Sequence, residues 1–181
     1  MTNTQIDIKE YVKRCLTTLE MCCEEPHHKE LSQKALLKFK NATVKSYSPN
    51  VLGCLQNKDL LVDTKLAKEF QNIILTLPFE SCDVNNDNGE DAGIVQLDKN
   101  VFDGLDFHIG FMVVDANKSF AEDRHEGDEL FMIINGTAEW LHNGNDEYET
   151  LSAGNIAYNG SMQLHGTKAN HTPTLALYIV L

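Results

Sequence analysis

The spacing of hydrophobic residues divides this chain into two parts with different periods. Between residues 5 and 82, apolar residues recur every three or four positions, the period of an amphipathic helix. The first apolar stripe comprises Ile8, Tyr11, Val12, Cys15, Leu16 and Leu19. Residues 29–42 and 64–77 repeat the pattern, and Pro78 stops the last of these segments. We therefore expect a helical N-terminal region over residues 1–82.

From residue 94 onward the pattern changes to short segments of alternating apolar and polar residues. Turn sequences such as Asn-Gly and Ser-Ala-Gly separate these segments at close intervals. Many short strands with close turns are typical of an antiparallel sandwich or barrel. Residues 83–93, rich in Asn, Asp and Gly, are predicted to be a polar linker. The expected fold is α+β but mainly β, with a C-terminal barrel over residues 94–181, N-terminal helices packed on it, and one compact unit.

Length and charge narrow the class of partner. The 181 residues, 42% of them hydrophobic, suffice for a core without disulfides or a structural metal. The formal net charge of -12 argues against nucleic acid or an anionic membrane as partner, because both are negative themselves. The charge says nothing about a small-molecule substrate. No secretory signal and no apolar run of about eighteen residues is evident, so we expect a cytoplasmic protein.

The cysteines indicate reduced thiols. There are five, all in the first half of the chain and without CxxC spacing, which does not suit a disulfide framework. Cys22-Cys23 followed by His27-His28 could form a metal site, but the paired spacing of structural zinc sites is missing. We prefer buried thiols beside surface histidines.

Between residues 123 and 133, charged residues precede an apolar run. In an extended strand, side chains of equal parity share a face, so Asp123, His125 and Glu129 would point one way with Phe131. The opposite, solvated face would carry Arg124, Glu126 and Asp128. Imidazole and carboxylate donors together suit iron, manganese, zinc, nickel or cobalt ions.

A further donor lies downstream. His165 stands between Leu164 and Gly166 in a predicted strand. By itself it would be a hydrogen-bonded core or rim histidine. Beside the face with Asp123, His125 and Glu129, it is predicted to close a metal site from a facing strand.

These positions carry a resemblance to a known family. His125, three residues, Glu129, six residues and Gly136, followed by Gly154, ten residues and His165, resemble the two motifs of the cupin superfamily. The nearest likeness is to the bacterial dimethylsulfoniopropionate (DMSP) lyases, whose sequences are similar in residues 128–140 and 165–181. The resemblance implies a double-stranded β-helix barrel, a divalent metal and often a homodimer. The implied metal ligands are Asp123, in place of a histidine, His125, Glu129 and His165.

The resemblance also implies a reaction, β-elimination of DMSP to dimethyl sulfide and acrylate, in which a tyrosinate removes the α-proton. Here Phe131 occupies the position of that basic tyrosine, and Phe120 replaces a second family tyrosine. Phenylalanine cannot accept a proton, so another base would be required. The other candidates for a base are Tyr158, Tyr178, His108 and His142, although a structural role is preferred for each.

We therefore expect a metal-dependent, lyase-like cupin acting on a small carboxylate-bearing substrate. Two alternatives stay open. One is a non-catalytic cupin that binds a metal or small ligand, suggested by the loss of both tyrosines. The other is a non-haem-iron dioxygenase, because imidazole and carboxylate ligands with open positions suit iron and dioxygen.

Overall fold

The structure is a computed structural model that describes residues 7–82, 91–142 and 148–181. The first half contains α1 (Ile8–Cys22), α2 (Pro26–Phe39), β1 (Thr43–Val44), η1 (Gly53–Leu60), α3 (Lys65–Phe70), η2 (Ile74–Thr76), β2 (Glu80–Ser81), β3 (Ala92–Gln96) and α4 (Leu97–Asn100). The second half contains β4 (Phe102–Asp103), β5 (His108–Val114), β6 (Ser119–Asp123), β7 (Glu129–Asn135), β8 (Thr137–His142), β9 (Tyr148–Ser152), β10 (Ile156–Asn159), β11 (His165–Ala169) and β12 (Thr174–Val180).

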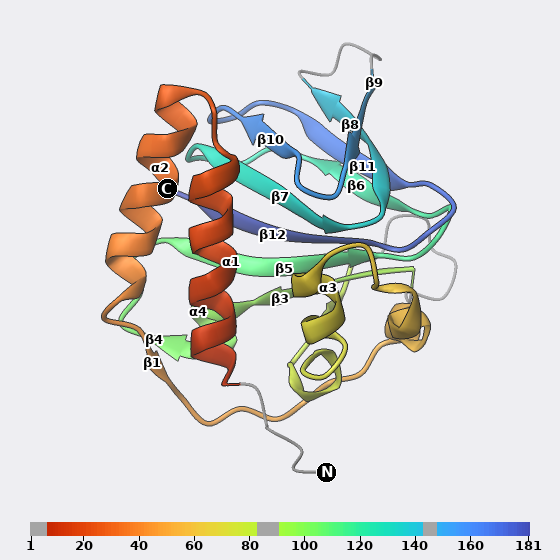
Figure 1. The fold of residues 1–181 in the computed structure, drawn as a ribbon, viewed down its shortest axis with the longest axis horizontal. Coiled ribbons are helices and arrows are strands. Elements are labelled where there is room, and N and C mark those ends of the chain that lie inside the picture. Colours follow the sequence, from red (N-terminus) through yellow and green to blue (C-terminus); the bar gives the residue numbers. More distant parts are fainter. Residues whose placement is uncertain (1–6, 83–90, 143–147) are drawn as a thin grey trace.

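Two antiparallel sheets form the body of the protein. The larger has six strands in the order β10-β7-β12-β5-β3-β2, and the smaller has four in the order β6-β11-β8-β9. In Figure 1 the four-stranded sheet lies on one side of the larger sheet, while α1 and α2 cover its other side. The barrel and the helices packed on it confirm the predicted fold class.

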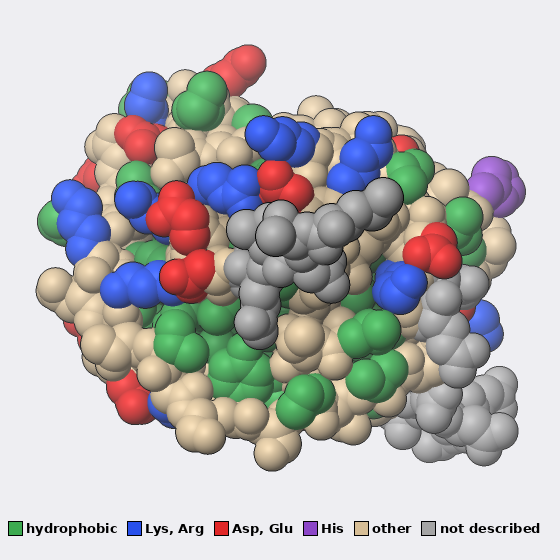
Figure 2. Space-filling view, turned by 60° about the horizontal axis from the view of Figure 1, so that its bottom comes forward, with side chains coloured by type: hydrophobic (Ala, Val, Ile, Leu, Met, Phe, Trp, Pro, Cys, Tyr) green, Lys and Arg blue, Asp and Glu red, His purple; other side chains and the backbone are tan. Residues whose placement is uncertain are grey.

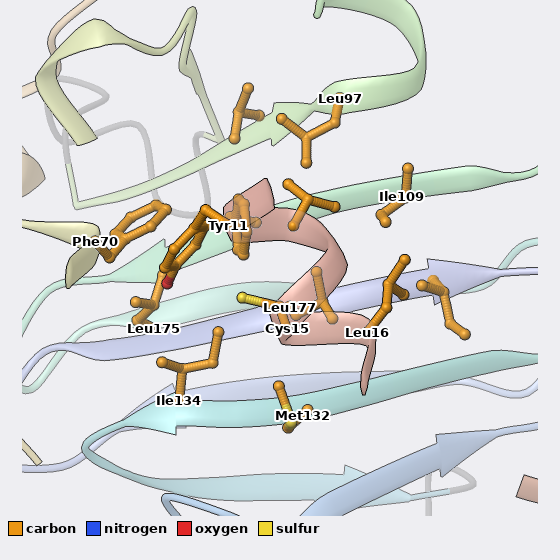
Figure 3. Packing of buried hydrophobic residues seen from close by; sticks show 14 of the residues in the cluster. Tyr11, Cys15, Leu16, Phe70, Leu97, Ile109, Met132, Ile134, Leu175 and Leu177 are labelled. Carbon is orange, nitrogen blue, oxygen red and sulfur yellow. The ribbon is translucent and has the colours of Figure 1, made fainter. Parts of the chain in front are cut away.

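The strands of the large sheet separate two hydrophobic clusters by parity. In β7, Leu130, Met132 and Ile134 belong to the cluster beneath the helices. Phe131 and Ile133 face the interior of the barrel instead. Figure 3 shows the helical side, where Tyr11, Cys15 and Leu16 of α1 pack over Leu177, Ile109 and Met132. Both faces are buried because a helix layer covers one and the second sheet covers the other.

The predicted helices form, with corrections to their extent. Asp7 caps α1 by accepting the N–H of Lys9, and Thr64 caps α3 through the N–H of Ala67. The third helix ends at Phe70 instead of running to residue 77, and a 3₁₀ turn follows. The short strands β1 and β2 interrupt the region predicted as helical because they pair with β4 and β3. Residues 83–90 of the predicted linker lie outside the described residues, and β3 begins at Ala92.

Two corrections concern the strands that hold the candidate site. Residues 97–100, within the region predicted to consist of short strands, form the short helix α4. The expectation of one extended strand from Asp123 to residue 133 is wrong. β6 ends at Asp123, β7 begins at Glu129, and the two strands belong to different sheets. The turn between them contains Gly127 with φ of +95°, a conformation that favours glycine.

The surface is mixed in character. Figure 2 shows charged side chains of both signs near groups of uncovered hydrophobic side chains. None of the helices described here is long and apolar enough to span a membrane. Cys15, Cys22 and Cys23 are free thiols, as the cysteine pattern predicts.

Candidate metal centre

Three donors meet at one end of the barrel. Nε2 of His125 lies 3.3 Å from Oε2 of Glu129, and Nε2 of His165 lies 3.1 Å from the same oxygen. The three ligand atoms all lie within 4.8 Å of one another. Glu129 opens β7 in the large sheet, His165 opens β11 in the small sheet, and His125 comes from the turn between β6 and β7. The site is therefore assembled where the two sheets approach each other.

Backbone carbonyls orient both imidazole rings. Nδ1 of His165 lies 2.9 Å from the carbonyl oxygen of Gln163, and Nδ1 of His125 lies 3.2 Å from that of Glu126. Because a carbonyl only accepts, each Nδ1 carries a proton and each Nε2 faces the cluster. Histidine ligands of metals characteristically donate their second N–H in this way. The donors and their orientation therefore fit a divalent transition metal.

Polar side chains inside the barrel hold the carboxylate of Glu129. This side chain is only 5% exposed, and Asn159 Nδ2 donates to its Oε2 at 3.1 Å. Trp140 Nε1 donates in turn to Asn159 Oδ1 at 3.4 Å. A buried carboxylate needs such partners, since burial without them is costly. Trp140 is 1% exposed and packs on Phe131, with ring centroids 4.5 Å apart.

The electrostatics of the cluster favour a cationic His125. The hydrogen bond to Glu129 raises the pKa of His125 to about 9, against the opposing effect of partial burial. At neutral pH, without a metal, the ring is therefore charged. A bound cation would take the place of that proton between the imidazole and the carboxylate.

Asp123 lies near this cluster but is not one of its members. It pairs in register with His165 across β6 and β11, and its side chain lines the same cavity. However, the group of donors within 4.8 Å of one another comprises only His125, Glu129 and His165. The Oδ1 atom of Asp123 accepts the N–H of Arg124 at 2.7 Å, so the carboxylate serves the turn that follows β6.

A cavity of about 440 Å³ opens beside the cluster. Its lining residues include Phe120 and Phe131, as well as the exposed Lys99 and His108. Glu126, expected on the opposite face from His125, also lines it, because residues 124–128 form a turn instead of a strand.

The proposed bases lie in different places. Tyr178 lines the cavity, and burial raises its pKa well above the usual value for a phenol. Tyr158 is not among the lining residues. Its hydroxyl donates to Asp128 at 3.1 Å, its ring packs on His28 at 4.7 Å, and burial raises its pKa. His108 lines the cavity, whereas the side chain of His142 lies outside the described residues.

Sequence reasoning missed the contribution of β3 and α4 to the cavity, where Gln96 and Lys99 line it. Alternation in β3 places Gln96 on the same face as Ile94. The alternation of Ile94 and Gln96 is visible in the sequence, but only the pairing of the strands decides which face of β3 lines the cavity.

Comparisons with known proteins concern the fold. No protein-family model matches the sequence, and no curated protein matches it. The crystal structure of the DMSP lyase DddQ from Ruegeria pomeroyi DSS-3 is similar, with a TM-score of 0.69 and 16% identity over 93% of this chain and 90% of that chain. A crystal structure described as that of the DMSP lyases RdDddP and RnDddQII has a TM-score of 0.67 and 14% identity, over 92% of each chain.

These alignments extend over the helices as well as the barrel, and at such low identity they bear on the fold alone. Together with the two facing antiparallel sheets, they confirm the architecture that the motifs around His125 and His165 imply. The chain has the cupin fold, in an arrangement similar to that of these DMSP lyases.

Proposed function

We propose that this protein is a metal-dependent cupin enzyme that catalyses β-elimination on a small carboxylate-bearing molecule. The observation that carries the proposal is the cluster of His125, Glu129 and His165, whose ligand atoms lie within 4.8 Å of one another beside a cavity. The structural similarity to proteins described as DMSP lyases makes DMSP the first substrate to test.

The donor set indicates what the cluster would hold. His125, Glu129 and His165 would bind iron, manganese, zinc, nickel or cobalt as a divalent ion. Such an ion supplies Lewis-acid polarisation of a substrate carboxylate, which makes the neighbouring C–H bond more acidic. Asp123 stands beside the cluster as the proposed further ligand, although in this conformation its Oδ1 accepts a backbone N–H.

The remaining walls suit a small molecule with an apolar part. A cavity of about 440 Å³ lies at the low end of the range for small-molecule sites. Phe120, Met112 and Phe131 give it an apolar surface that would exclude water from the reacting carbon. Phe131 cannot serve as the base, so the proton must go to another residue.

Metal analysis of the purified protein is the first test. We expect about one transition-metal ion per chain in the wild type, and loss of most of it in His165→Ala and Glu129→Gln. His171→Ala, at an exposed histidine, is the matched control and should keep its metal. A wild type that binds no transition metal would end the proposal.

Incubation of the metal-loaded protein with DMSP tests the reaction. We expect acrylate and dimethyl sulfide in equal amounts, with formation abolished in His165→Ala. The rival hypothesis is a non-catalytic cupin, favoured by phenylalanine at positions 120 and 131. That hypothesis predicts metal binding without turnover, so clear product formation refutes it.

One observation favours a dioxygenase as the second candidate function. With Asp123 outside the cluster, the donors are two histidines and one carboxylate, a set used by non-haem iron oxygenases. Oxygen uptake by the iron-loaded protein with thiols or diketones would favour that class. Elimination under anaerobic conditions would argue against it.

A further inference from the structure

β-Elimination needs a proton acceptor, and the cavity offers few. Besides the cluster of His125, Glu129 and His165, the titratable groups that line the cavity are Lys99, His108, Asp123, Glu126 and Tyr178. Lys99 is an exposed cation, and Asp123 and Glu126 stand within two residues of His125 at the metal centre. The choice therefore falls between Tyr178 and His108.

Tyr178 is poorly suited to accept a proton. Its side chain is 8% exposed, and burial raises the pKa of its hydroxyl, with smaller contributions in the same direction from Asp98 and Glu129. A phenol that stays protonated at neutral pH donates a hydrogen bond but removes no proton. Tyr178 therefore serves as a wall of the cavity.

His108, in contrast, is paired with a carboxylate. Nδ1 of His108 lies 2.9 Å from Oδ2 of Asp98, whose side chain is only 9% exposed. The other oxygen of Asp98 accepts the N–H of Ile109 at 3.1 Å, which fixes the orientation of the carboxylate. Since a carboxylate only accepts, the proton of a neutral His108 lies on Nδ1 and Nε2 has a free lone pair.

Strand register places this histidine on the side of the sheet that faces the cavity. Val180 in β12 pairs with His108 on one side and with Glu129 on the other. His108 and Glu129 are therefore two strands apart on the same face, about 10 Å between backbones. A substrate with its carboxylate at the metal cluster would extend along this face toward His108.

The local sequence brings Asp98 and His108 together. α4 follows β3 directly and places Asp98 near the start of β5, where His108 lies. Gly110, the next residue of β5 on the cavity face, leaves space for the hydroxyl of Tyr178, which a Cβ would meet at 2.4 Å. The Tyr178 hydroxyl therefore packs closely over Gly110, beside His108 on the cavity face.

We propose that Nε2 of His108 removes the α-proton in place of the missing tyrosine, and that Asp98 positions the ring. The inference rests on the proposed function. As the α C–H bond breaks, its electron pair forms the new C=C bond. At the same time the β C–S bond breaks with its pair leaving on sulfur, so DMSP yields acrylate and dimethyl sulfide. His108 becomes an imidazolium beside Asp98 and returns the proton to water.

The tautomer is testable without turnover. In ¹⁵N-histidine NMR spectra of the zinc-loaded protein, we expect His108 as the Nδ1–H tautomer when it is neutral. Asp98→Asn should abolish that preference, while the exposed His171 should not change. An Nε2–H tautomer for His108 in the wild type would overturn the assignment.

Kinetics with DMSP test the catalytic role. His108→Gln should lower kcat by about 10²- to 10⁴-fold, with KM and metal content near wild type. His108→Asn serves as a second variant if the first unfolds, and His171→Gln should stay within about twofold of wild type. Asp98→Asn should lower kcat with little effect on KM.

The possible results distinguish a failure of the role of His108 from a failure of the proposed lyase function. Wild-type kcat in a folded, metal-loaded His108→Gln variant overturns the role of His108 and leaves the lyase proposal standing. A wild type that binds metal but forms no acrylate overturns the proposed function, and the role of His108 with it.

Discussion

Metal binding should depend strongly on pH because a proton occupies the site first. In the metal-free protein the pKa of His125 is about 9, so at pH 7 its ring is protonated. A histidine must lose that proton to bind a metal. We therefore expect metal binding at pH 7 to release about one proton from His125, and the apparent affinity to rise with pH.

The size of the effect follows from the pKa. A competing proton with a pKa of about 9 weakens binding about 100-fold at pH 7 and about twofold at pH 9, a net gain of about 50-fold. The side chain of His125 is 31% exposed, and with solvent screening we expect a gain of at least about tenfold.

The stability of the metal-free protein should follow the opposite trend. The pKa of His125 is higher in the folded protein than in the unfolded chain, where it is about 6.5. The resulting stabilisation is therefore fully present below about pH 6.5, and it is lost as the pH rises through about 9. The melting temperature of the metal-free protein should fall across that window, while the difference from the zinc-loaded protein widens.

Calorimetric titration with zinc, repeated in two buffers of different ionisation enthalpy, counts the released protons. His125→Gln is the control and should release about one proton fewer at pH 7. Affinity independent of pH between 7 and 8.5, or equal proton release in the variant, would refute the reasoning.

Three substitutions test the surroundings of the site and the packing of the helical layer. Asn159→Ala removes a donor to the buried Glu129, so metal affinity should fall about 10- to 100-fold in a chelator competition assay; unchanged affinity would contradict this role. Gly110→Ala places a Cβ 2.4 Å from the Tyr178 hydroxyl and should cost about 3 kcal/mol in urea unfolding, whereas a neutral effect would show that the neighbours move aside. Thr64→Ala removes the cap of α3 and a 2.8 Å hydrogen bond to a β7 carbonyl; it should cost about 1–2 kcal/mol by thermal unfolding without loss of metal.

Much of the fold could be predicted from periodicity. The helical stripe around Leu16 and the alternation of Leu130 with Phe131 follow from side-chain geometry, since each element must bury one face. Boundaries were less certain. The apolar run that follows Phe70 has a helical pattern, yet the chain leaves the helix there and later supplies β2 to the sheet edge.

For the candidate site, the motif spacing selected His125, Glu129 and His165, and the structure brings these three together. The proposed reason was only partly right. Parity along a single strand does not apply to His125 and Glu129, because a turn separates β6 from β7. Asp123, chosen by the same parity, ends β6 beside the cluster, and its Oδ1 accepts the N–H of Arg124 instead.

The sequence by itself therefore determined the local elements and the chemical identity of the donors. Periodicity and residue type are properties of neighbours along the chain, and they suffice to predict a helical layer, a barrel and a His/Glu site. Only the tertiary structure decided which polar residues share the cavity, because register joins residues far apart in sequence. It brings His108 to the face of Glu129 through Val180, and it turns Tyr158 away to Asp128.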